Sequence, residues 1–483
     1  MNCDTPGIVH DLAASARQAC DPEAFRAMGH RLIDTAANYL ADTTAGKRVP
    51  VMPWVEPETM AYEWPPHFPA APQGDMNRLF EAVLTEATHL HHPHYAGHQV
   101  PGPLPAAALC DFVAAFTNNA MAVYEMGMSG TAMERSVIRW LADSTGLGPA
   151  ADGLLTSGGS LGNLTALLAA RAVKTPAGAD ERLPSLLVSE QAHYSVRRSV
   201  KIMGWGKDGA IAVPCDDRFR IRVDLLAEAQ ARAEALGRRV IGVVGSACST
   251  ATGSFDPLDA IADYCEANNL WFHVDAAHGG PACLSAKYRP LLSGIERADS
   301  VVIDPHKMML MPALVSAVLF RNGDHSYVAF DERASYLLDR DPREEWYNLG
   351  YRTFECTKRM ASLKLYACLA CYGTAMFADY ITAMFDLGAR FAALLRDAQD
   401  FEVAIEPDCN IVCFRYTPDR ACDMDALQAS IRKTLVREGS FYIVQTRLPQ
   451  GLFLRTTLIN PFTEESHLRA LLDAIRRIGV RLA

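Results

Sequence analysis

Residues 271–280 read WFHVDAAHGG, and residues 300–307 read SVVIDPHK. Each stretch contains a short apolar run with β-branched residues next to Gly or Pro, which is typical of a buried strand. Asp275 ends the first run. A gap long enough for a helix separates the two stretches, and Lys307 comes shortly after the second run. Because open α/β sheets hold their ligands at the carboxyl ends of their strands, we expect both side chains at one such edge.

An acid and a lysine placed together in this way suit pyridoxal phosphate, which needs a lysine for its Schiff base and an acid against its pyridinium nitrogen. Residues 153–163 read GLLTSGGSLGN and come directly before an expected helix over residues 164–173. Glycine lets the backbone approach an anion, and the free N–H groups of a helix start attract negative charge. The stretch matches neither a dinucleotide-binding motif nor a P-loop. An ordinary capped turn is the alternative, but beside the acid and the lysine a phosphate site at Gly159 and Ser160 is the better interpretation.

Strands alternate with helices from residue 153 to residue 320, which predicts a mostly parallel sheet covered on both faces and hence an α/β fold. A long helix over residues 375–399 leads away, and the strands and helices after it predict a small α+β domain. Residues 1–45 have helical periodicity, whereas residues 49–72 are rich in Pro and aromatic residues and are expected to lie extended over another surface, such as a second subunit. The expected parts are an N-terminal segment over residues 1–80, a large domain over 81–375 and a small domain over 376–483. Strands of the small domain are expected over residues 401–405, 411–416 and 452–458.

The composition allows a large hydrophobic core and gives no excess of basic residues. Of 483 residues 49% are hydrophobic, and the net charge of -10 argues against a nucleic-acid-binding surface. No apolar run reaches about 18 residues, and the N-terminus has no basic region followed by an apolar one. We therefore expect no membrane span, no signal peptide and a cytoplasmic protein. The 13 cysteines are scattered, and Cys368 and Cys371 lie in an apolar helical pattern, so core packing in a reducing compartment is the expected role.

Five histidines lie between residues 89 and 98. No carboxylate stands near them at ligand spacing, and a local histidine tract is only a compositional hint of metal binding. We expect no metal site, and instead a loop edge with one or two histidines facing a site.

From about residue 80 to residue 480 the chain resembles the group II pyridoxal-phosphate decarboxylases, the family of glutamate, cysteine sulfinate, diaminobutyrate and aromatic amino acid decarboxylases. The matching motifs are HVDAA at 273–277, DPHK at 304–307, TSGGS at 156–160 and HYS at 193–195, in the family's order. The resemblance implies the aspartate aminotransferase-like fold (fold type I), with a seven-stranded sheet in the large domain. It also implies a homodimer with active sites at the interface, and a carboxy-lyase (EC 4.1.1) that converts an L-amino acid to its amine and carbon dioxide.

The resemblance also implies roles for single residues. Lys307 forms the aldimine with pyridoxal phosphate that leads to a quinonoid intermediate, Asp275 keeps the pyridine nitrogen protonated, and His193 stacks on the ring. The other residues expected at the cofactor are Gly159, Ser160, Thr250, Ala277 and His306.

Four further matches bear on the reaction and on the substrate. Tyr347, counted back from FEC at 354–356, takes the place of the loop tyrosine that returns a proton to the substrate carbon; an exposed structural tyrosine is the alternative. The stretch ASYL at 334–337 resembles the one just before that loop. Arg455 matches the arginine that binds the substrate carboxylate, a role that suits a bidentate guanidinium, and His98 lies in the loop that reads the substrate side chain.

His278 stands where the family usually has an aromatic residue, and we expect it to contact the substrate. Two alternatives to simple decarboxylation stay open. One is a different pyridoxal phosphate reaction, such as oxidative decarboxylation–deamination to an aldehyde or transamination, and Tyr347 argues against it. The other is a non-catalytic regulatory homologue, and Lys307, Asp275 and His193 argue against that. The substrate amino acid is not identified by the sequence.

Overall fold

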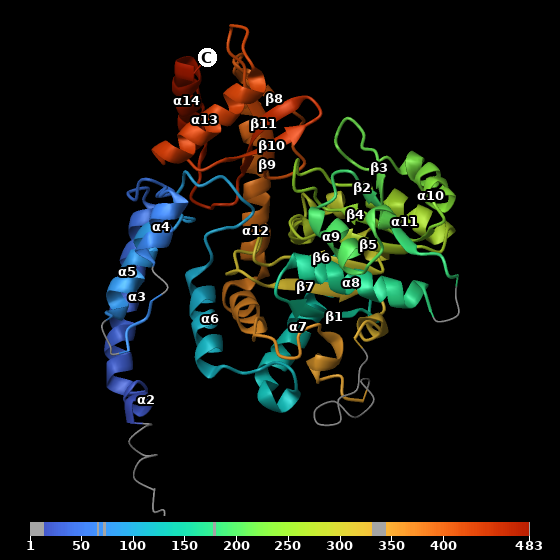
Figure 1. Cartoon of the computed structure of the whole chain (residues 1–483), viewed down its shortest axis with the longest axis horizontal. Helices are drawn as coiled ribbons and strands as arrows, with labels where there is room; N and C mark the ends of the chain where they lie inside the picture. The colour runs from blue at the N-terminus through green and yellow to red at the C-terminus, as the bar shows by residue number, and fades with distance from the viewer. Residues whose placement is uncertain (1–13, 65–66, 71–73, 177–179, 331–343, 483) are drawn as a thin grey trace, which may run out of the picture.

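Seven strands form the larger of two sheets in this computed structural model, which describes residues 14–64, 67–70, 74–176, 180–330 and 344–482. The strand order is β1-β7-β6-β5-β4-β2-β3 (Figure 1). The sheet is parallel from β6 to β3, and β7 runs antiparallel to both of its neighbours. The prediction of a mostly parallel seven-stranded sheet is therefore confirmed. The bounds are β1 Asp152–Thr156, β2 Pro184–Ser189, β3 Ala210–Val213, β4 Arg239–Ser246, β5 Trp271–Asp275, β6 Ser300–Ile303 and β7 Ser316–Phe320.

Helices cover both faces of this sheet. Side chains alternate between the faces of a strand, so Leu154 packs with Ala166 of α8 whereas its neighbour Leu155 belongs to the core on the opposite face with Val137 of α7. Helices α8 and α9 lie on the first face, and α7, α10 and α11 lie on the second. Burial on both faces explains why these strands have continuous apolar sequences. The bounds are α7 Met128–Thr145, α8 Gly159–Lys174, α9 Tyr194–Ile202, α10 Leu226–Ala235 and α11 Leu258–Ala267.

The two stretches that carry Asp275 and Lys307 are neighbours in the sheet. Strands β5 and β6 pair in parallel, with Asp275 opposite Val302, and the turn that contains Lys307 follows β6 directly. Both residues therefore lie at the carboxyl edge of the sheet, as expected from their positions after apolar runs.

The smaller sheet has four antiparallel strands in the order β10-β11-β9-β8. Strand β10 was not predicted, because Gln445 and Arg447 are not buried and its sequence is mostly polar. The helix predicted to begin at residue 375 is part of a longer element, α12 Ser362–Asp397, whose backbone departs from helical geometry at Gly373. The other bounds are β8 Phe401–Val403, β9 Ile411–Tyr416, β10 Val444–Leu448, β11 Gly451–Thr457, α13 Met424–Glu438 and α14 Glu465–Leu482.

Helices of the N-terminal part form an arm that stands beside the main body (Figure 1). The expectation of an extended segment over residues 49–72 is wrong for residues 57–63, which form helix α4. Pro57 occupies its first position after an extended Glu56, and proline favours rather than breaks a helix there. The bounds are α2 Ala14–Gln18, α3 Pro22–Thr44, α4 Pro57–Glu63, α5 Met76–Glu86 and α6 Pro105–Thr117.

Among the described residues, α12 is the one helix that is long and apolar enough to cross a membrane by length and composition. A core helix of a folded domain meets the same criterion. Helix α12 packs against α6 and α7 at one end of the molecule and against β8, β9 and α14 at the other, so its apolar side chains serve the contact between the two domains.

Candidate active site

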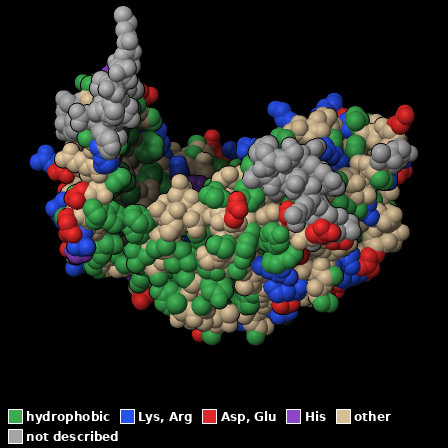
Figure 2. All heavy atoms as spheres, turned by 90° about the horizontal axis from the view of Figure 1, so that it is seen from below, with side chains coloured by type: hydrophobic (Ala, Val, Ile, Leu, Met, Phe, Trp, Pro, Cys, Tyr) green, Lys and Arg blue, Asp and Glu red, His purple; other side chains and the backbone are tan. Residues whose placement is uncertain are grey.

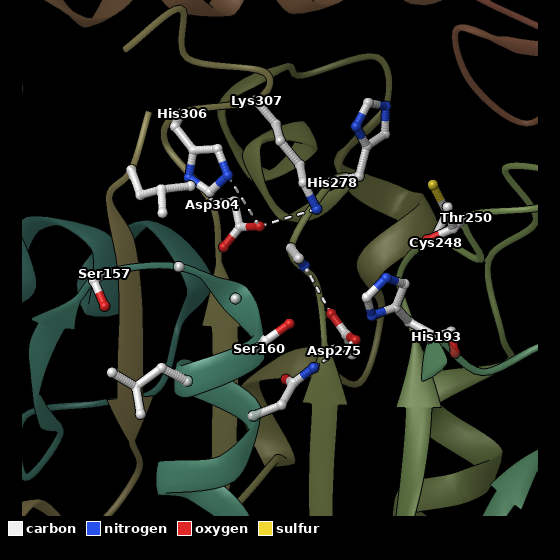
Figure 3. Close-up of a pocket in the computed structure, with 17 residues that line it drawn as sticks. Ser157, Ser160, His193, Cys248, Thr250, Asp275, His278, Asp304, His306 and Lys307 are labelled. Carbon is white, nitrogen blue, oxygen red and sulfur yellow. Dashed lines mark hydrogen bonds and ion pairs between the residues drawn. The ribbon is translucent and has the colours of Figure 1, made fainter. Parts of the chain in front are cut away.

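A cavity of about 370 Å³ opens at the carboxyl edge of the large sheet (Figure 3). The structure brings nine of the twelve predicted site residues together around it. They come from the ends of β2, β4, β5 and β6 and from the start of α8, which is the geometry expected for a ligand site in an open α/β sheet. The nine residues are Gly159, Ser160, His193, Thr250, Asp275, Ala277, His278, His306 and Lys307.

Lys307 enters the cavity from the turn after β6. Its Nζ lies 2.9 Å from Oδ2 of Asp304, a carboxylate that is almost fully buried. His306 donates its Nδ1–H to the carbonyl oxygen of Val315 at 2.6 Å, so its Nε2 faces Asp304 at 3.7 Å. Burial opposes the charge on Lys307, but the carboxylates of Asp304 and Asp275 outweigh it and raise the pKa of Lys307.

Asp275 lies across the cavity from Lys307 and accepts hydrogen bonds from neutral donors. Its Oδ2 accepts a hydrogen bond from Nδ2 of Asn163 at 2.8 Å, and its Oδ1 accepts one from the backbone N–H of Ala277 at 3.2 Å. Asp275 is 8% exposed. A buried carboxylate fixed in this way is oriented toward the cavity before any ligand arrives.

A chain of hydrogen bonds beneath the cavity fixes Asn163. Trp271 Nε1 donates to Ser300 Oγ at 2.9 Å, and Ser300 lies 2.9 Å from Nδ1 of His273. The other ring nitrogen of His273 lies 3.1 Å from Oδ1 of Asn163. Burial lowers the pKa of His273 to about 4, so the imidazole is neutral at physiological pH. The network then requires Nδ1 to accept from Ser300 and Nε2–H to donate to Asn163.

The same amide reaches His193 through a serine. Nδ2 of Asn163 donates to Ser195 Oγ at 2.9 Å, and Ser195 Oγ lies 2.7 Å from Nδ1 of His193. Asn163 and Ser195 therefore connect the expected ring-stacking residue with the expected pyridine partner Asp275. Neither was predicted as a site residue. The available signal was an asparagine among the mostly apolar positions 161–170, where a polar side chain that becomes buried requires a partner.

The turn between β1 and α8 has the geometry of an anion site. Gly158 has a φ of 143°, a conformation that favours glycine. A Cβ atom at Gly159 would lie 2.8 Å from Oδ2 of Asp304, so a larger residue would clash there. Ser160 lies in the first turn of α8, where backbone N–H groups are free. Together with Lys307 and the fixed carboxylate of Asp275, this turn fits a phosphate-bearing pyridine aldehyde.

A sequence model of the family described as pyridoxal-dependent decarboxylase conserved domain matches residues 57–417. The chain belongs to this family. It is 29% identical to the aromatic-L-amino-acid decarboxylase of Bacillus atrophaeus over 466 residues, in an alignment that covers 95% of this chain and 96% of that protein. It is 33% identical to an L-aspartate decarboxylase of Metarhizium robertsii over 386 residues, in an alignment that covers 78% of this chain and 77% of that protein. The crystal structure of mouse CSAD matches with a TM-score of 0.88 at 26% identity, over 95% of this chain and 99% of that one.

The chain is therefore a pyridoxal phosphate-dependent amino acid decarboxylase (EC 4.1.1) with the aspartate aminotransferase-like fold. Its cofactor is pyridoxal phosphate, and the resemblance stated from the motifs is confirmed.

His278 lines the decarboxylase cavity next to the small domain. Its Nε2 lies 2.9 Å from Oδ1 of Asn410, whose Nδ2 donates to the carbonyl oxygen of Leu458 at 3.0 Å. Burial lowers the pKa of His278 to about 3, so the ring is neutral and donates its Nε2–H to Asn410. The residue that departs from the family pattern thus joins the cavity to the small domain.

Three predicted site residues do not line this cavity. Arg455 lies behind it, and its Nη1 donates to the carbonyl oxygen of Thr250 at 2.6 Å. His98 is exposed, with its ring 5.8 Å from that of Tyr442. Tyr347 lies against Tyr124, with ring centroids 5.4 Å apart. The stretch 334–337 and most of the expected loop lie outside the described residues.

Histidines of the histidine-rich stretch pack against neighbouring rings and the backbone. His94 stacks on Phe441 with ring centroids 3.9 Å apart, and His92 Nδ1 accepts the backbone N–H of His94 at 3.0 Å. In the parts of the chain that the structure describes, no group of three or more His, Cys, Asp or Glu side chains is placed to hold a metal ion.

Proposed function

We propose that the decarboxylase removes the α-carboxylate of an L-amino acid in this cavity and releases the amine and carbon dioxide. The observation that carries the proposal is that Lys307 Nζ and the carboxylate of Asp275 face one cavity, with His193 and the anion-binding turn around it (Figure 3). Pyridoxal phosphate, when bound, supplies the electron sink for the pair that the departing carboxylate leaves behind.

The side chains divide the remaining work. Asp275, fixed by Asn163 and by a backbone N–H, is placed to hold a proton on a pyridine nitrogen. His193 accepts from Ser195 through Nδ1, which leaves its ring face and its Nε2–H for a ligand. Lys307 is the residue that would hold the cofactor covalently and, once released, would move protons between substrate atoms.

Arg455 is proposed to bind the substrate carboxylate. It is 7% exposed, and its Nε has no hydrogen-bond partner among the described residues. An unpaired donor on a buried guanidinium costs free energy, and a carboxylate is the group that best satisfies it. The hydrogen bond from Arg455 to Thr250 places the guanidinium directly behind a cavity-lining residue.

The proposed substrate class is an acidic amino acid. Partial desolvation of the His98 ring lowers its pKa, and the nearby positive charges of Arg455 and Arg432 lower it further. A cationic surface of this kind favours a second carboxylate on the substrate. The relative with 33% identity is an L-aspartate decarboxylase, which supports the same choice.

We propose that the decarboxylase acts as a homodimer with active sites at the interface. Tyr347 does not line the cavity of its own chain, so its proposed role as proton donor requires it to reach the cavity of a second copy. Hydrophobic side chains gather on the underside of the molecule near the arm (Figure 2). Such a patch on one face is typical of a subunit interface. The exposed apolar residues on α6 and just before or at the start of α7 are Leu109, Phe112, Val113, Phe116, Met126 and Met128.

The dimer has its own test. Phe116→Asp on α6 is expected to yield monomers in analytical ultracentrifugation and to lose activity, because it places a charge in the interface. Val480→Asp on α14 is the matched control, since Val480 is also exposed and lies outside the patch. A dimer that persists in Phe116→Asp would contradict this arrangement.

We propose that the three parts of the chain divide at about residues 80 and 375 and that the decarboxylase is cytoplasmic. The twelve cysteines within the described residues are all free, and Cys248 and Cys409 keep their Sγ atoms 3.8 Å apart without a disulfide. Unpaired thiols at this distance support a reducing compartment.

The central experiment is Lys307→Ala, with Lys287→Ala as the control because Lys287 is exposed and pairs with Asp386 far from the cavity. Lys307→Ala is expected to lose the visible absorbance of the Schiff base and all carbon dioxide release, whereas the control keeps both. L-Aspartate, L-glutamate, L-cysteine sulfinate, L-2,4-diaminobutyrate and aromatic amino acids are tested as substrates, with amine, aldehyde, ammonia and peroxide assayed together. Aldehyde with peroxide as the main products would overturn simple decarboxylation.

A further inference from the structure

Asp304 is the second buried carboxylate of the cavity, and it has a charged partner. Its Oδ2 lies 2.9 Å from Lys307 Nζ and 3.7 Å from His306 Nε2 (Figure 3). Its Oδ1 accepts a hydrogen bond from Ser316 Oγ. Asp304 comes directly after β6 and begins the turn that contains Lys307. The backbone N–H of Lys307 closes this turn by donating to the carbonyl oxygen of Asp304 at 2.9 Å. The lysine expected to hold the cofactor is therefore held by an acid from its own turn.

The carboxylate of Asp304 also faces the anion-binding turn. A Cβ atom at Gly159 would come within 2.8 Å of Oδ2 and 2.9 Å of Oδ1. The negative charge thus lies against the start of α8, where the phosphate of the cofactor is expected. A carboxylate and a phosphate that lie close together in a buried site repel each other strongly, unless a proton or a cation stands between them.

We propose that Asp304 controls cofactor loading, because it holds Lys307 as an ammonium ion in the cofactor-free enzyme and places a negative charge beside the phosphate site. The inference rests on the assignment of Lys307 as the cofactor lysine. Schiff-base formation requires the free amine. The ammonium first gives one proton to water, Nζ then attacks the aldehyde carbon, a C=N bond forms, and the carbonyl oxygen leaves as water with the two remaining Nζ hydrogens. Asp304 stabilises the ammonium form of Lys307, which is the state before the first of these steps.

The pH dependence of loading follows from the groups that face Nζ. Burial opposes its charge, and Asp304 and Asp275 overcome that opposition, so the pKa of Lys307 is raised and little free amine is present at neutral pH. The rate of loading should therefore rise with pH. An amide at position 304 removes one of the two carboxylates and should move this rise to lower pH. The other titratable groups around Nζ are His193, Cys248, His278 and His306.

The experiment follows cofactor uptake by the apoenzyme and does not depend on turnover. Asp304→Asn preserves the shape of the side chain and removes its charge. Binding of pyridoxal phosphate is monitored by the visible absorbance of the Schiff base across a pH series. We expect the rate profile of Asp304→Asn to move to lower pH, with roughly tenfold faster loading at neutral pH, because the ammonium form of Lys307 loses one of the two carboxylates that stabilise it. The equilibrium dissociation constant is expected to fall as well.

Asp299→Asn is the matched control. Asp299 accepts from the backbone N–H of Phe272 at 2.8 Å and from Arg321 at 3.0 Å, at the opposite edge of the same sheet. Its loading profile should equal that of the unmodified enzyme. Asp304→Glu, which keeps the charge, should retain the high-pH profile, and Asp304→Ser replaces the asparagine variant if that variant does not fold.

Two outcomes separate this inference from the proposed function. An unchanged or slower loading profile in Asp304→Asn, with Lys307→Ala still unable to form the Schiff base, overturns the role of Asp304 alone. Schiff-base absorbance that persists in Lys307→Ala overturns the lysine assignment on which both proposals depend.

Discussion

Asp275 and Asp304 line the same cavity from neighbouring strands, but different kinds of partner hold them. Asp275 accepts hydrogen bonds from the amide of Asn163 and a backbone N–H, both neutral, whereas Asp304 lies 2.9 Å from the Lys307 ammonium group. The first carboxylate is fixed by a hydrogen-bond relay beneath the cavity, which runs from Trp271 through Ser300 and His273 to Asn163. The second is held by a side chain that must change partners when a cofactor binds.

The difference separates a permanent function from an exchangeable one. Neutral donors orient Asp275 and leave its charge for a ligand, because no Lys or Arg side chain in the described parts of the chain is at contact distance from it. An ion pair does the reverse, since each partner satisfies the other until a competitor arrives. On this basis we propose that Asp275 serves the bound cofactor and that Asp304 serves the cofactor-free enzyme.

Replacing Asp275 with Asn should have the largest effect. The amide keeps the contact with Asn163 but cannot hold a proton on a pyridine nitrogen, so kcat for carbon dioxide release is expected to fall by at least about two orders of magnitude. Steady-state assays at saturating cofactor measure it. Asp386→Asn is the control, because Asp386 pairs with Lys287 outside the cavity. If kcat falls by less than about threefold, a residue other than Asp275 holds the proton on the pyridine nitrogen.

The next effect is expected at Asn163, which fixes Asp275. Asn163→Ala removes the donor to Oδ2 and leaves a buried carboxylate short of one hydrogen bond, which costs about 2 kcal/mol. Urea unfolding of the apoenzyme should show that loss in the free energy of unfolding. Cofactor affinity should also fall, because the carboxylate loses its orientation. An unaltered affinity would mean that Asp275 does not depend on the relay.

The sequence revealed the two strand ends better than it revealed the relay. Asp275, Lys307 and Gly159 belong to compact motifs in which local order alone places the residues at a sheet edge or a helix start. Asn163 contacts Asp275 across 112 positions of sequence, and that register depends on how α8 packs on β5. No local pattern contains this information, and only the unusual polarity of the position signals it.

The same reason explains the residues that the cavity does not include. His98 and Tyr347 were assigned by motif order, which gives the neighbourhood of a residue but not the surface toward which it points. In the structure Tyr347 packs on Tyr124, away from Lys307 of its own chain. Helix α4 and strand β10 were missed because a proline can start a helix and because an edge strand with polar residues lacks an apolar run.

The relay should also be detected in the pH dependence of stability. His273 stays neutral in the folded protein down to about pH 4, whereas in the unfolded chain it gains a proton below about pH 6.5. Between these values the unfolded state binds more protons, so stability is complete above pH 6.5 and is lost as the pH falls toward 4. His273→Gln should reduce the slope of unfolding free energy against pH by about 1.4 kcal/mol per pH unit in this window.

Other histidines with a lowered pKa keep part of that slope in the variant, and His92 and His278 are the two with the largest effect. The pKa of His92 is lowered to about 4 and that of His278 to about 3, in both cases chiefly by burial, so each contributes with the same sign. Urea titrations at pH 7 and at pH 5 in parallel measure the difference. An identical slope in His273→Gln would show that His273 is protonated in the folded protein, which would also reverse the direction of its hydrogen bond with Ser300.

Ser316→Ala should have the smallest effect and is the sharpest test of the contrast between the two carboxylates. Ser316 donates to Asp304 Oδ1, as Asn163 donates to Asp275, but Asp304 keeps Lys307 and His306 when the serine is gone. We expect a loss of about 1 kcal/mol in stability and a cofactor-loading profile like that of the unmodified enzyme. If Ser316→Ala instead weakens cofactor binding as much as Asn163→Ala does, then Asp304 depends on its neutral donor as Asp275 does, and the ion pair does not set its behaviour.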